Sequence, residues 1–422
     1  MKIITVRNID SFVAKIRPKT SQKNKKIVES ILSDVQKNGD TAVKKYEKKF
    51  GSNVTSLRIS KQDLVYAYSQ VSKNELNAIK LSKKLLENSE KLVKSKLKDF
   101  TIKNNGTQIS KIFSPIDSVG CYVPGGLAKY PSSAIMSVTP AKVAGVKRIV
   151  VVTPPNKNGK IDPLTLVAAD ICGATEIYKT GGAQAIAALS YGTKTIKQVD
   201  KIVGPGGSFV TLAKSIVSEN SSIDMLAGPT ELGIIADTNS NANYIAVDLA
   251  SQAEHSKDTF CYLITNSTNK AKEVNRLLEQ KITVLPRNEI IKTSLRKNGF
   301  IAICKTKNEM IDLANKLAPE HLEIITKNPE QLANKIKTPG LVLIGENTPS
   351  SVSDYLLGSN HILPTNGFGK TRGSLSVMDF IKLGTKIKTS KNELRKISKH
   401  MSILTSSEGL PNHNKALEER LQ

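Results

Sequence analysis

The chain has 422 residues, and 62 Lys and Arg against 37 Asp and Glu give it a net charge of +25. Hydrophobic residues make up 39% of the sequence and aromatic residues 5%, so we expect a core of Ile, Leu, Val and Ala, as in α/β proteins. No apolar run approaches the roughly 20 residues of a membrane helix, and the charged N-terminus lacks the pattern of a secretory signal. We therefore expect a cytoplasmic protein with no membrane partner.

The positive charge is unevenly distributed. Residues 1–100 hold 23 basic and 10 acidic residues, a net charge of +13, whereas residues 201–260 hold 3 and 7, a net charge of −4. In the first segment the lysines lie opposite Ile, Leu and Val at helical spacing, which indicates solvated faces of amphipathic helices. A nucleic-acid-binding protein is the alternative hypothesis. The chain has neither zinc-finger spacing nor aromatic-interleaved basic repeats, so we expect no nucleic-acid partner.

The four cysteines, Cys121, Cys172, Cys261 and Cys304, lie far apart and form no CxxC pair. This spacing indicates neither a disulfide framework nor a thiolate zinc site. We expect small, buried core residues at these positions.

Periodicity divides the chain into a helical region and an alternating region. Helical patterns cover residues 21–100, with breaks predicted at 38–40 and 51–53, and a polar turn is predicted at 104–106. A first series then predicts strands at 148–155, 176–180 and 200–207 (with its exit loop), and helices at 164–174, 183–192 and 208–218. A second series predicts strands at 231–237, 259–265, 300–305, 322–326 and 341–345, and helices at 243–255, 269–280, 309–318 and 329–337.

This alternation is typical of parallel sheets with right-handed crossovers. We predict an α/β fold with two doubly wound, incomplete Rossmann-like sheets and helical N-terminal and C-terminal extensions. The stretch after about Lys382 is basic and then helical, and it is too short to own a core. We expect it to dock on another part of the protein.

Four glycine-rich loops lie in the alternating region, at 120–126, 180–185, 203–208 and 227–231. Ligands of open parallel sheets bind outside the carboxyl ends of the strands, where we expect these loops. The second and third loops open directly onto helix N-termini, whose free N–H groups favour an anion such as a pyrophosphate. The loops predict a phosphate-bearing ligand, although no GxGxxG motif is present.

Histidine is scarce, and four of the five histidines lie near carboxylate or amide side chains in the last 170 residues. Gln252 and His255 are i and i+3 and project from one helix face. Asp354 and His413 complete a possible four-ligand N/O set without thiolate, which suits a zinc ion that organises substrate chemistry. The alternative for each of these histidines, taken singly, is an ordinary surface or core residue.

Glu320 and His321 form a second candidate site. Pro319 ends the preceding helix and a strand follows, so both side chains lie at a junction that directs them into a cleft. A neighbouring carboxylic acid and imidazole are what proton transfer near neutral pH requires. A charged surface pair at a helix end is the competing explanation.

Nine motifs, in this order, resemble the histidinol dehydrogenase family over about residues 21–418. They are GCYVPGG, TPAKVAG, GGAQAIAAL, KIVGPG, AGPTE, DLASQAEH, APEHL, SDYLLGSNHILPT and EGLPNH. The resemblance implies an enzyme that catalyses the final step of histidine biosynthesis. It implies oxidation of L-histidinol to L-histidine through L-histidinaldehyde, with two NAD+ and one Zn2+ per subunit.

The family's site residues carry over by position. The resemblance implies that His321 is the base and that Glu320 activates the water that attacks the aldehyde. It implies zinc ligands at Gln252, His255, Asp354 and His413. It implies substrate-binding residues at Thr230, Gln252, His255, His321, Asp354, His361, Glu408 and His413. It implies nucleotide-binding residues at Tyr122, Gln184 and Gly207.

Two positions depart from the family pattern. Gly207 replaces the usual Asn, which removes a side-chain hydrogen bond to the nucleotide, and Thr230 replaces a Ser but keeps the hydroxyl. A zinc hydrolase built on the same metal set is a further alternative, but it leaves the glycine-rich loops without a purpose.

The resemblance also implies a homodimer in which the C-terminal tail completes the partner's site, so that Glu408 and His413 act in trans. The alternative is a tail that packs on its own subunit. The expected division is an N-terminal segment 1–20, a main domain of 21–121 with 232–381, an inserted domain 122–231, and a swapped tail 382–422.

Overall fold

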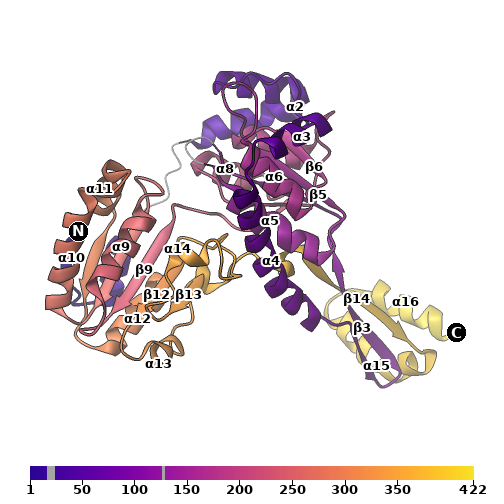
Figure 1. Cartoon of the computed structure of the whole chain (residues 1–422). Coiled ribbons are helices and arrows are strands. Elements are labelled where there is room, and N and C mark those ends of the chain that lie inside the picture. The colour runs from indigo at the N-terminus through magenta and orange to yellow at the C-terminus, as the bar shows by residue number, and fades with distance from the viewer. Residues whose placement is uncertain (17–23, 126–128) are drawn as a thin grey trace.

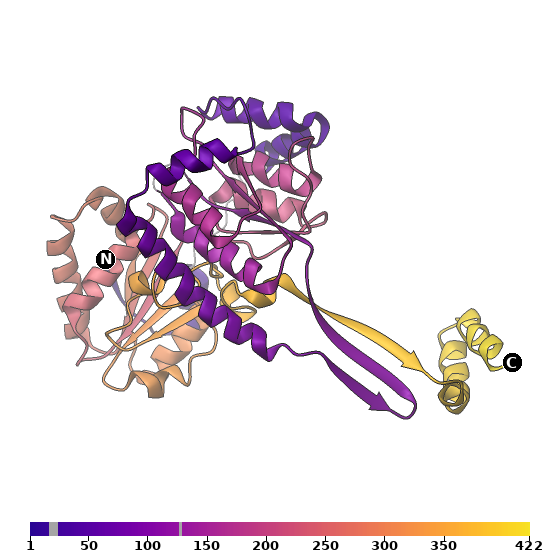
Figure 2. The same cartoon turned by 45° about the vertical axis from the view of Figure 1, so that its right-hand side comes forward.

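The computed structural model describes residues 1–16, 24–125 and 129–422, which fold into two α/β units and a projecting arm (Figure 1). In Figure 2 the arm extends away from both units and carries the C-terminus at its far end. The two parallel sheets confirm the predicted fold class. No helix in the described ranges is both long and apolar enough to span a membrane.

The first unit is built on a parallel sheet with the order β6–β5–β4–β7–β8. The strands are β4 (Ser118–Tyr122), β5 (Arg148–Thr153), β6 (Glu176–Lys179), β7 (Lys201–Val203) and β8 (Ser222–Ile223). The connecting helices are α5 (Pro131–Ala144), α6 (Pro163–Cys172), α7 (Gly182–Tyr191) and α8 (Ser208–Val217). The chain order reverses between β4 and β7, which is the topological switch point of a doubly wound sheet.

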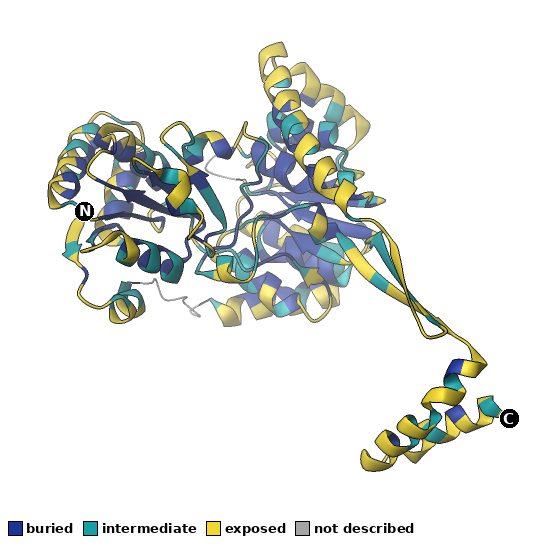
Figure 3. Cartoon of the chain, turned by 90° about the horizontal axis from the view of Figure 1, so that it is seen from below, coloured by how far each residue is buried: buried dark blue, intermediate teal, exposed yellow. Residues whose placement is uncertain are grey.

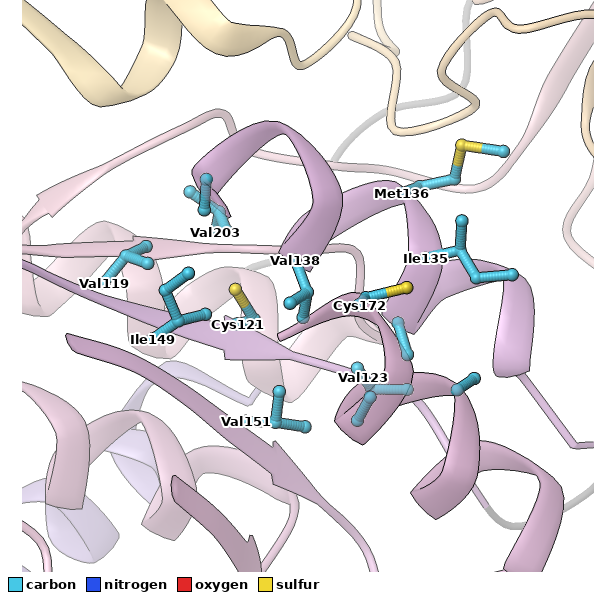
Figure 4. Packing of buried hydrophobic residues seen from close by; sticks show 14 of the residues in the cluster. Val119, Cys121, Val123, Ile135, Met136, Val138, Ile149, Val151, Cys172 and Val203 are labelled. Atoms are coloured by element: carbon cyan, nitrogen blue, oxygen red, sulfur yellow. The ribbon is translucent and has the colours of Figure 1, made fainter. Parts of the chain in front are cut away.

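Both faces of this sheet are buried. In β5, Ile149 and Val151 belong to a core cluster with residues of α5 and α6, whereas Val150 and Val152 belong to one with residues of α2 and α7. This alternation follows from the two-residue period of a strand. Figure 4 shows Cys121 and Cys172 within the first cluster. All four cysteines are free and buried, as predicted.

The N-terminal helices α2 (Lys25–Lys49), α3 (Lys61–Ser69) and α4 (Lys73–Lys96) pack on the first unit, against α7, α6 and α5 respectively. The predicted break at 38–40 is a kink at Gly39, whose φ of 50° favours glycine, and α2 ends before the second predicted break. The expected division joined residues 21–121 to the second unit instead. An amphipathic pattern shows which helix face is buried but does not specify which sheet it covers.

The second unit contains a parallel sheet with the order β1–β11–β10–β9–β12–β13. The strands are β1 (Lys2–Thr5), β9 (Glu231–Ala236), β10 (Phe260–Thr265), β11 (Phe300–Ile303), β12 (His321–Ile325) and β13 (Leu341–Ile344). The helices are α1 (Ile9–Ile16), α9 (Ala242–Ala253), α10 (Thr268–Ile282), α11 (Asn288–Lys297), α12 (Lys307–Leu317), α13 (Pro329–Ala333) and α14 (Ser350–Ser353). The order reverses between β9 and β12.

The arm is an antiparallel sheet with the order β14–β3–β2. Its elements are β2 (Phe100–Asn104), β3 (Thr107–Pro115) and β14 (Ile381–Thr389), followed by α15 (Lys391–Ser407) and α16 (Pro411–Leu421). Two short 3-10 helices, η1 (Phe368–Lys370) and η2 (Val377–Phe380), precede β14. The predicted turn at 104–106 joins β2 to β3, and the basic stretch after Lys382 begins as a strand. Figure 3 shows that the arm and its two helices are largely exposed.

Candidate functional site

The glycine-rich loops of the first unit follow the carboxyl ends of β4, β6 and β7, as predicted. Gly126, which closes the first loop, lies outside the described residues. The fourth loop, 227–231, is not a strand-to-helix loop. It runs from β8 directly into β9, and so it joins the carboxyl edge of the first sheet to the amino edge of the second.

The N-terminus of α7 is already occupied by a carboxylate of the chain itself. Oε1 of buried Glu47 accepts hydrogen bonds from Thr180 Oγ1 (2.8 Å), Gly181 N (2.9 Å) and Gln184 Nε2 (2.8 Å). The three hydrogen bonds lower the pKa of Glu47, but burial outweighs them, so the pKa lies above its ordinary value. The next amide, Gly182 N, donates to the hydroxyl of Tyr122 at 3.1 Å. A carboxylate of the protein itself therefore occupies the position at which the sequence predicts an anion of the ligand.

The N-terminus of α8 is different. Its cap residue, Gly207, makes no side-chain bond, and a Cβ there would meet no atom within 4 Å. Asp224 stabilises this loop, because its carboxylate accepts hydrogen bonds from Gly204 N (2.8 Å) and from the ammonium group of buried Lys214. The two helix starts follow β6 and β7, and Tyr122 ends β4 between them. The structure thus brings the loops with the predicted nucleotide residues to the switch point.

Glu320 and His321 lie at the amino end of β12, beside the start of β9. Glu320 Oε2 accepts from Glu231 N at 2.8 Å, and Glu231 Oε2 accepts from Glu320 N at 3.3 Å. His321 Nδ1 lies 3.4 Å from the carbonyl oxygen of Glu231, and Nε2 lies 3.2 Å from Asp354 Oδ1. Both predicted catalytic residues are buried, which argues against the alternative of a charged surface pair.

Burial and neighbouring charges shift the acid–base properties of this cluster. Burial raises the pKa of Glu320 to about 8, although the nearby His321 opposes the shift. Burial alone would lower the pKa of His321, but the hydrogen bond to Asp354 and the Glu320 charge outweigh it and raise the pKa to about 9. Such perturbed values are typical of catalytic acids and bases.

Asp354 lies at the centre of the predicted metal set. It follows α14, and its backbone carbonyl accepts from His361 Nδ1 at 2.9 Å. Burial raises the pKa of its carboxyl, but the His321 hydrogen bond and the charges of His361 and His255 outweigh it and lower the pKa. Asp354 thus contacts His321 through its carboxylate and His361 through its backbone carbonyl, and His255 is close enough to act on its charge.

Gln252 is the other predicted ligand from α9. Its side chain is buried, and Nε2 has no hydrogen-bond partner among the described residues. Rotating this amide by 180° would present Oε1 at the same unpartnered position. An unpartnered buried amide in the last turn of α9, the helix that leads to His255, fits a divalent cation with mixed N/O ligands.

The C-terminal residues of the predicted site lie elsewhere in this chain. Glu408 and His413 are exposed, on or beside the helices at the far end of the arm (Figure 2). Among the described residues, no three His, Cys, Asp or Glu side chains form a metal-binding group. Within a single chain His255 and Asp354 are close enough for their charges to interact, whereas His413 lies on the arm. Thr230 is half-buried beside Glu231, and its carbonyl accepts from Phe260 N at 2.9 Å.

Sequence reasoning missed two residues that shape these sites. Glu47 lies within a lysine-rich helical run, and no local signal separates it from its exposed neighbours. Glu231 ends the AGPTE motif, so the motif marks it, but its pairing with Glu320 depends on the neighbouring positions of β9 and β12.

Together, the fold and these residues define a two-unit α/β enzyme with loops for a nucleotide and a buried acid–base cluster. The family model described as histidinol dehydrogenase matches residues 15–421. Histidinol dehydrogenase of Methanocaldococcus jannaschii is 43% identical over 396 residues, which cover 94% of this chain and 92% of that protein. Histidinol dehydrogenase of Bacillus subtilis is 42% identical over 403 residues, with 95% and 94% covered.

A solved structure agrees with these comparisons. The crystal structure of histidinol dehydrogenase from Elizabethkingia anophelis matches with a TM-score of 0.94 and 33% identity, over 100% of this chain and 98% of that one. The chain therefore belongs to the histidinol dehydrogenase family and is an NAD-dependent oxidoreductase.

Proposed function

We propose that this protein oxidises L-histidinol to L-histidine through L-histidinaldehyde, using two NAD+ and one Zn2+ per subunit. This reaction is the final step of histidine biosynthesis. The observation that carries the proposal is the buried cluster of Glu320, His321 and Asp354 in a chain of this family. Both oxidations need a base at the reacting carbon, and the second also needs activated water.

His321 is the base for both oxidations. In the neutral form Nδ1–H donates to the carbonyl oxygen of Glu231. Nε2, which meets Asp354 Oδ1 in this structure, is then the atom that accepts the proton of the carbinol hydroxyl, with Asp354 serving as a metal ligand. The hydride of the same carbon leaves for the nicotinamide, which makes the aldehyde. In the second oxidation, His321 takes a hydroxyl proton from the aldehyde hydrate while the second hydride leaves.

Glu320 removes a proton from the water that adds to the aldehyde. Its carboxyl is fixed by the Glu231 amide, and its Oε2 lies 3.9 Å from His321 Nδ1, so the two groups act at neighbouring positions. Because burial raises its pKa, its ionised form is a stronger base than an exposed carboxylate. His321 thus deprotonates the alcohol and the aldehyde hydrate, and Glu320 activates the water that forms the hydrate.

Gln252, His255 and Asp354 would hold the metal with His413. A bound Zn2+ anchors and polarises a substrate without redox chemistry of its own. The net charge of −4 over residues 201–260 also suits a cationic amino alcohol. Thr230, His361 and Glu408 would complete the substrate site.

The loops of the first unit would hold NAD+ near Tyr122, Gln184 and Gly207. The start of α8 offers backbone N–H groups without a side-chain cap. The loop at 227–231 joins this carboxyl edge to the edge of the second sheet that carries Glu320 and His321. One short connection therefore links the proposed NAD+ site, which accepts the hydride, to the proposed base.

We also propose a cytoplasmic homodimer in which the arm places Glu408 and His413 in the partner's site. The exposed arm supports this assembly, because the two residues lie apart from the rest of the set within one chain (Figure 3). Mixed dimers test it. When His321→Asn and His413→Ala subunits are combined, a site shared between subunits restores one intact site per mixed dimer. A tail that acts on its own subunit restores none.

The proposed function is tested by NADH formation from purified protein with zinc, histidinol and NAD+. We expect activity in the wild type and a loss of at least about 100-fold in His321→Asn, because a general base contributes that much or more. Turnover of histidinol without NAD+ would instead favour zinc-dependent hydrolytic chemistry and would refute the proposal.

A further inference from the structure

Glu323 lies two residues after His321 on β12, and no predicted role covers it. Residues i and i+2 of a strand point to the same face, so His321 and Glu323 share the face of the sheet that is covered by α9. Leu322 and Ile324 alternate with them and belong to the core on the other face. A fully apolar residue would be the ordinary choice at position 323, because Glu323 is only 1% exposed.

The carboxyl of Glu323 is bound to the start of α14. Its Oε1 accepts a hydrogen bond from Ser350 N at 2.7 Å, and both residues are buried. The helix α14 is four residues long and is followed directly by Asp354, whose Oδ1 meets His321 Nε2. One end of this short helix is thus fixed by Glu323, and the other end carries the carboxylate of the metal set.

Asp248 on α9 faces the same carboxyl. The charge of Asp248 raises the pKa of Glu323, so the two carboxyls lie close together, and Glu323 Oε2 has no hydrogen-bond partner among the described residues. Asp248 precedes Gln252 by four residues, so both lie on the same face of α9. The helices α9 and α14 also contact each other, and β12 lies beside them (Figure 1). The acid pair therefore joins the three elements that carry Gln252, His321 and Asp354.

We propose that Glu323, paired with Asp248, is a positioning residue that fixes α14 and thereby places Asp354 for metal binding and for contact with His321. The inference rests on the proposed function in one respect, since it takes Asp354 as a metal ligand. Neither residue of the pair belongs to the predicted catalytic, substrate-binding or metal-binding set. It acts through the Ser350 amide and through α9, as supporting partners of metal ligands commonly do.

Substitutions at Glu323 separate this role from general stability. Glu323→Ala removes the acceptor for Ser350 N and the partner of Asp248. Glu323→Gln keeps an oxygen for the Ser350 amide and offers its NH2 group to the Asp248 carboxylate. Asp237→Ala is the matched control, because Asp237 is also a buried carboxylate of the second unit and accepts a hydrogen bond from the Lys327 backbone amide at 3.0 Å. Asp237 follows the carboxyl end of β9, so it lies at the edge of the sheet opposite Glu320 and His321.

The measurement is zinc affinity of the purified full-length protein, by competition with a chromophoric chelator. Hydrogen exchange of the segment 350–357 is measured in parallel. We expect Glu323→Ala to weaken zinc binding about 10- to 100-fold and to speed exchange of this segment. Glu323→Gln should stay within about threefold of wild type in both. Asp237→Ala should leave zinc affinity unchanged even where it lowers the midpoint of thermal unfolding.

The outcomes distinguish the inference from the function on which it rests. A wild type that binds no zinc refutes the proposed metal set. A wild type that binds zinc, with equal affinity in Glu323→Ala, refutes the positioning role alone. Equal weakening in Glu323→Ala and Asp237→Ala also refutes it, because general destabilisation would then explain both. If Glu323→Ala does not fold, a zinc affinity of Glu323→Gln more than about tenfold weaker than wild type refutes the proposed hydrogen-bonding role.

Discussion

Glu231 and Glu320 are paired reciprocally, since the carboxyl of each accepts a hydrogen bond from the backbone N–H of the other, at 2.8 and 3.3 Å. The two residues come from β9 and from the approach to β12, which are neighbours at the switch point of the second sheet. This pairing buries the Glu320 carboxyl and fixes it beside His321. It explains how a carboxylate with a raised pKa is held at the proposed reacting centre.

Glu320→Gln should slow oxidation of histidinaldehyde by at least about 100-fold, because the amide accepts no proton from water. In the wild type, this rate should rise with pH through about 8, since burial raises the pKa of Glu320 to about 8 and only the ionised form is a base. NADH formation from the aldehyde across this pH range measures both effects. Exposed Glu330→Gln is the control, and a normal rate in Glu320→Gln would show that another group activates the water.

Gly207→Asn should tighten NAD+ binding about three- to tenfold, the range of one added hydrogen bond. The position has a φ of −66° and open space around a Cβ, so a side chain fits without strain. Gly207→Ala separates the hydrogen bond from the filling of space. Titration of NAD+ by fluorescence quantifies the three proteins, and equal affinity for the Asn and Ala variants would rule out a side-chain contact here.

Glu47→Ala should raise the KM for NAD+ at least about tenfold and leave zinc affinity unchanged. The substitution removes the acceptor for Thr180, Gly181 and Gln184, and each buried donor left unpaired costs about 1–3 kcal/mol. Glu47→Gln retains an oxygen and should show a smaller effect. Initial rates at varied NAD+ concentrations test this, with exposed Lys48→Ala as the neighbour control. An unchanged KM in Glu47→Ala would mean that this loop does not bind the nucleotide.

The Asp248–Glu323 pair should make the protein less stable as pH rises. Burial raises the pKa of Asp248 to about 6 and, with the Asp248 charge, that of Glu323 to about 8. The folded state therefore holds more protons than the unfolded state between about pH 4 and 8. The resulting stabilisation is present at acid pH and is lost as pH increases through the folded-state values.

Urea unfolding at about pH 5.5 and pH 8 measures this dependence. The free energy of unfolding should fall more across this interval in the wild type than in Glu323→Gln, which has one fewer titrating carboxyl. Glu330→Gln should behave like the wild type. An identical fall in all three proteins would contradict the assigned origin of the pH dependence.

Local patterns predicted much of the fold and part of the site. The glycines before α7 and α8 and the junction at Glu320 follow from short stretches of sequence, and the structure has them there. The amino-edge location of His321 was not predictable, because it depends on how strands far apart in the chain pair. For the same reason, no pattern around Glu47 indicates that it reaches the loop at Thr180, 133 residues away.

The expected fusion of residues 21–121 with the second unit illustrates the same limit. The helices α2 and α4 were predicted from their periodicity, yet their apolar faces fit the first unit. The tail gives a second example. Its residues Glu408 and His413 carry motif signals, but within one chain they lie on the arm, so the role proposed for them requires a second subunit.

The central claim is a four-electron oxidation at one site that contains Glu320 and His321. Its most direct test is the ratio of NADH formed to histidinol consumed by the purified, zinc-loaded protein, with the product of a limiting amount of histidinol identified in parallel. The account predicts two NADH for each histidinol consumed, with histidine as the product and no accumulated aldehyde. A ratio of one, with histidinaldehyde released as the product, would contradict it.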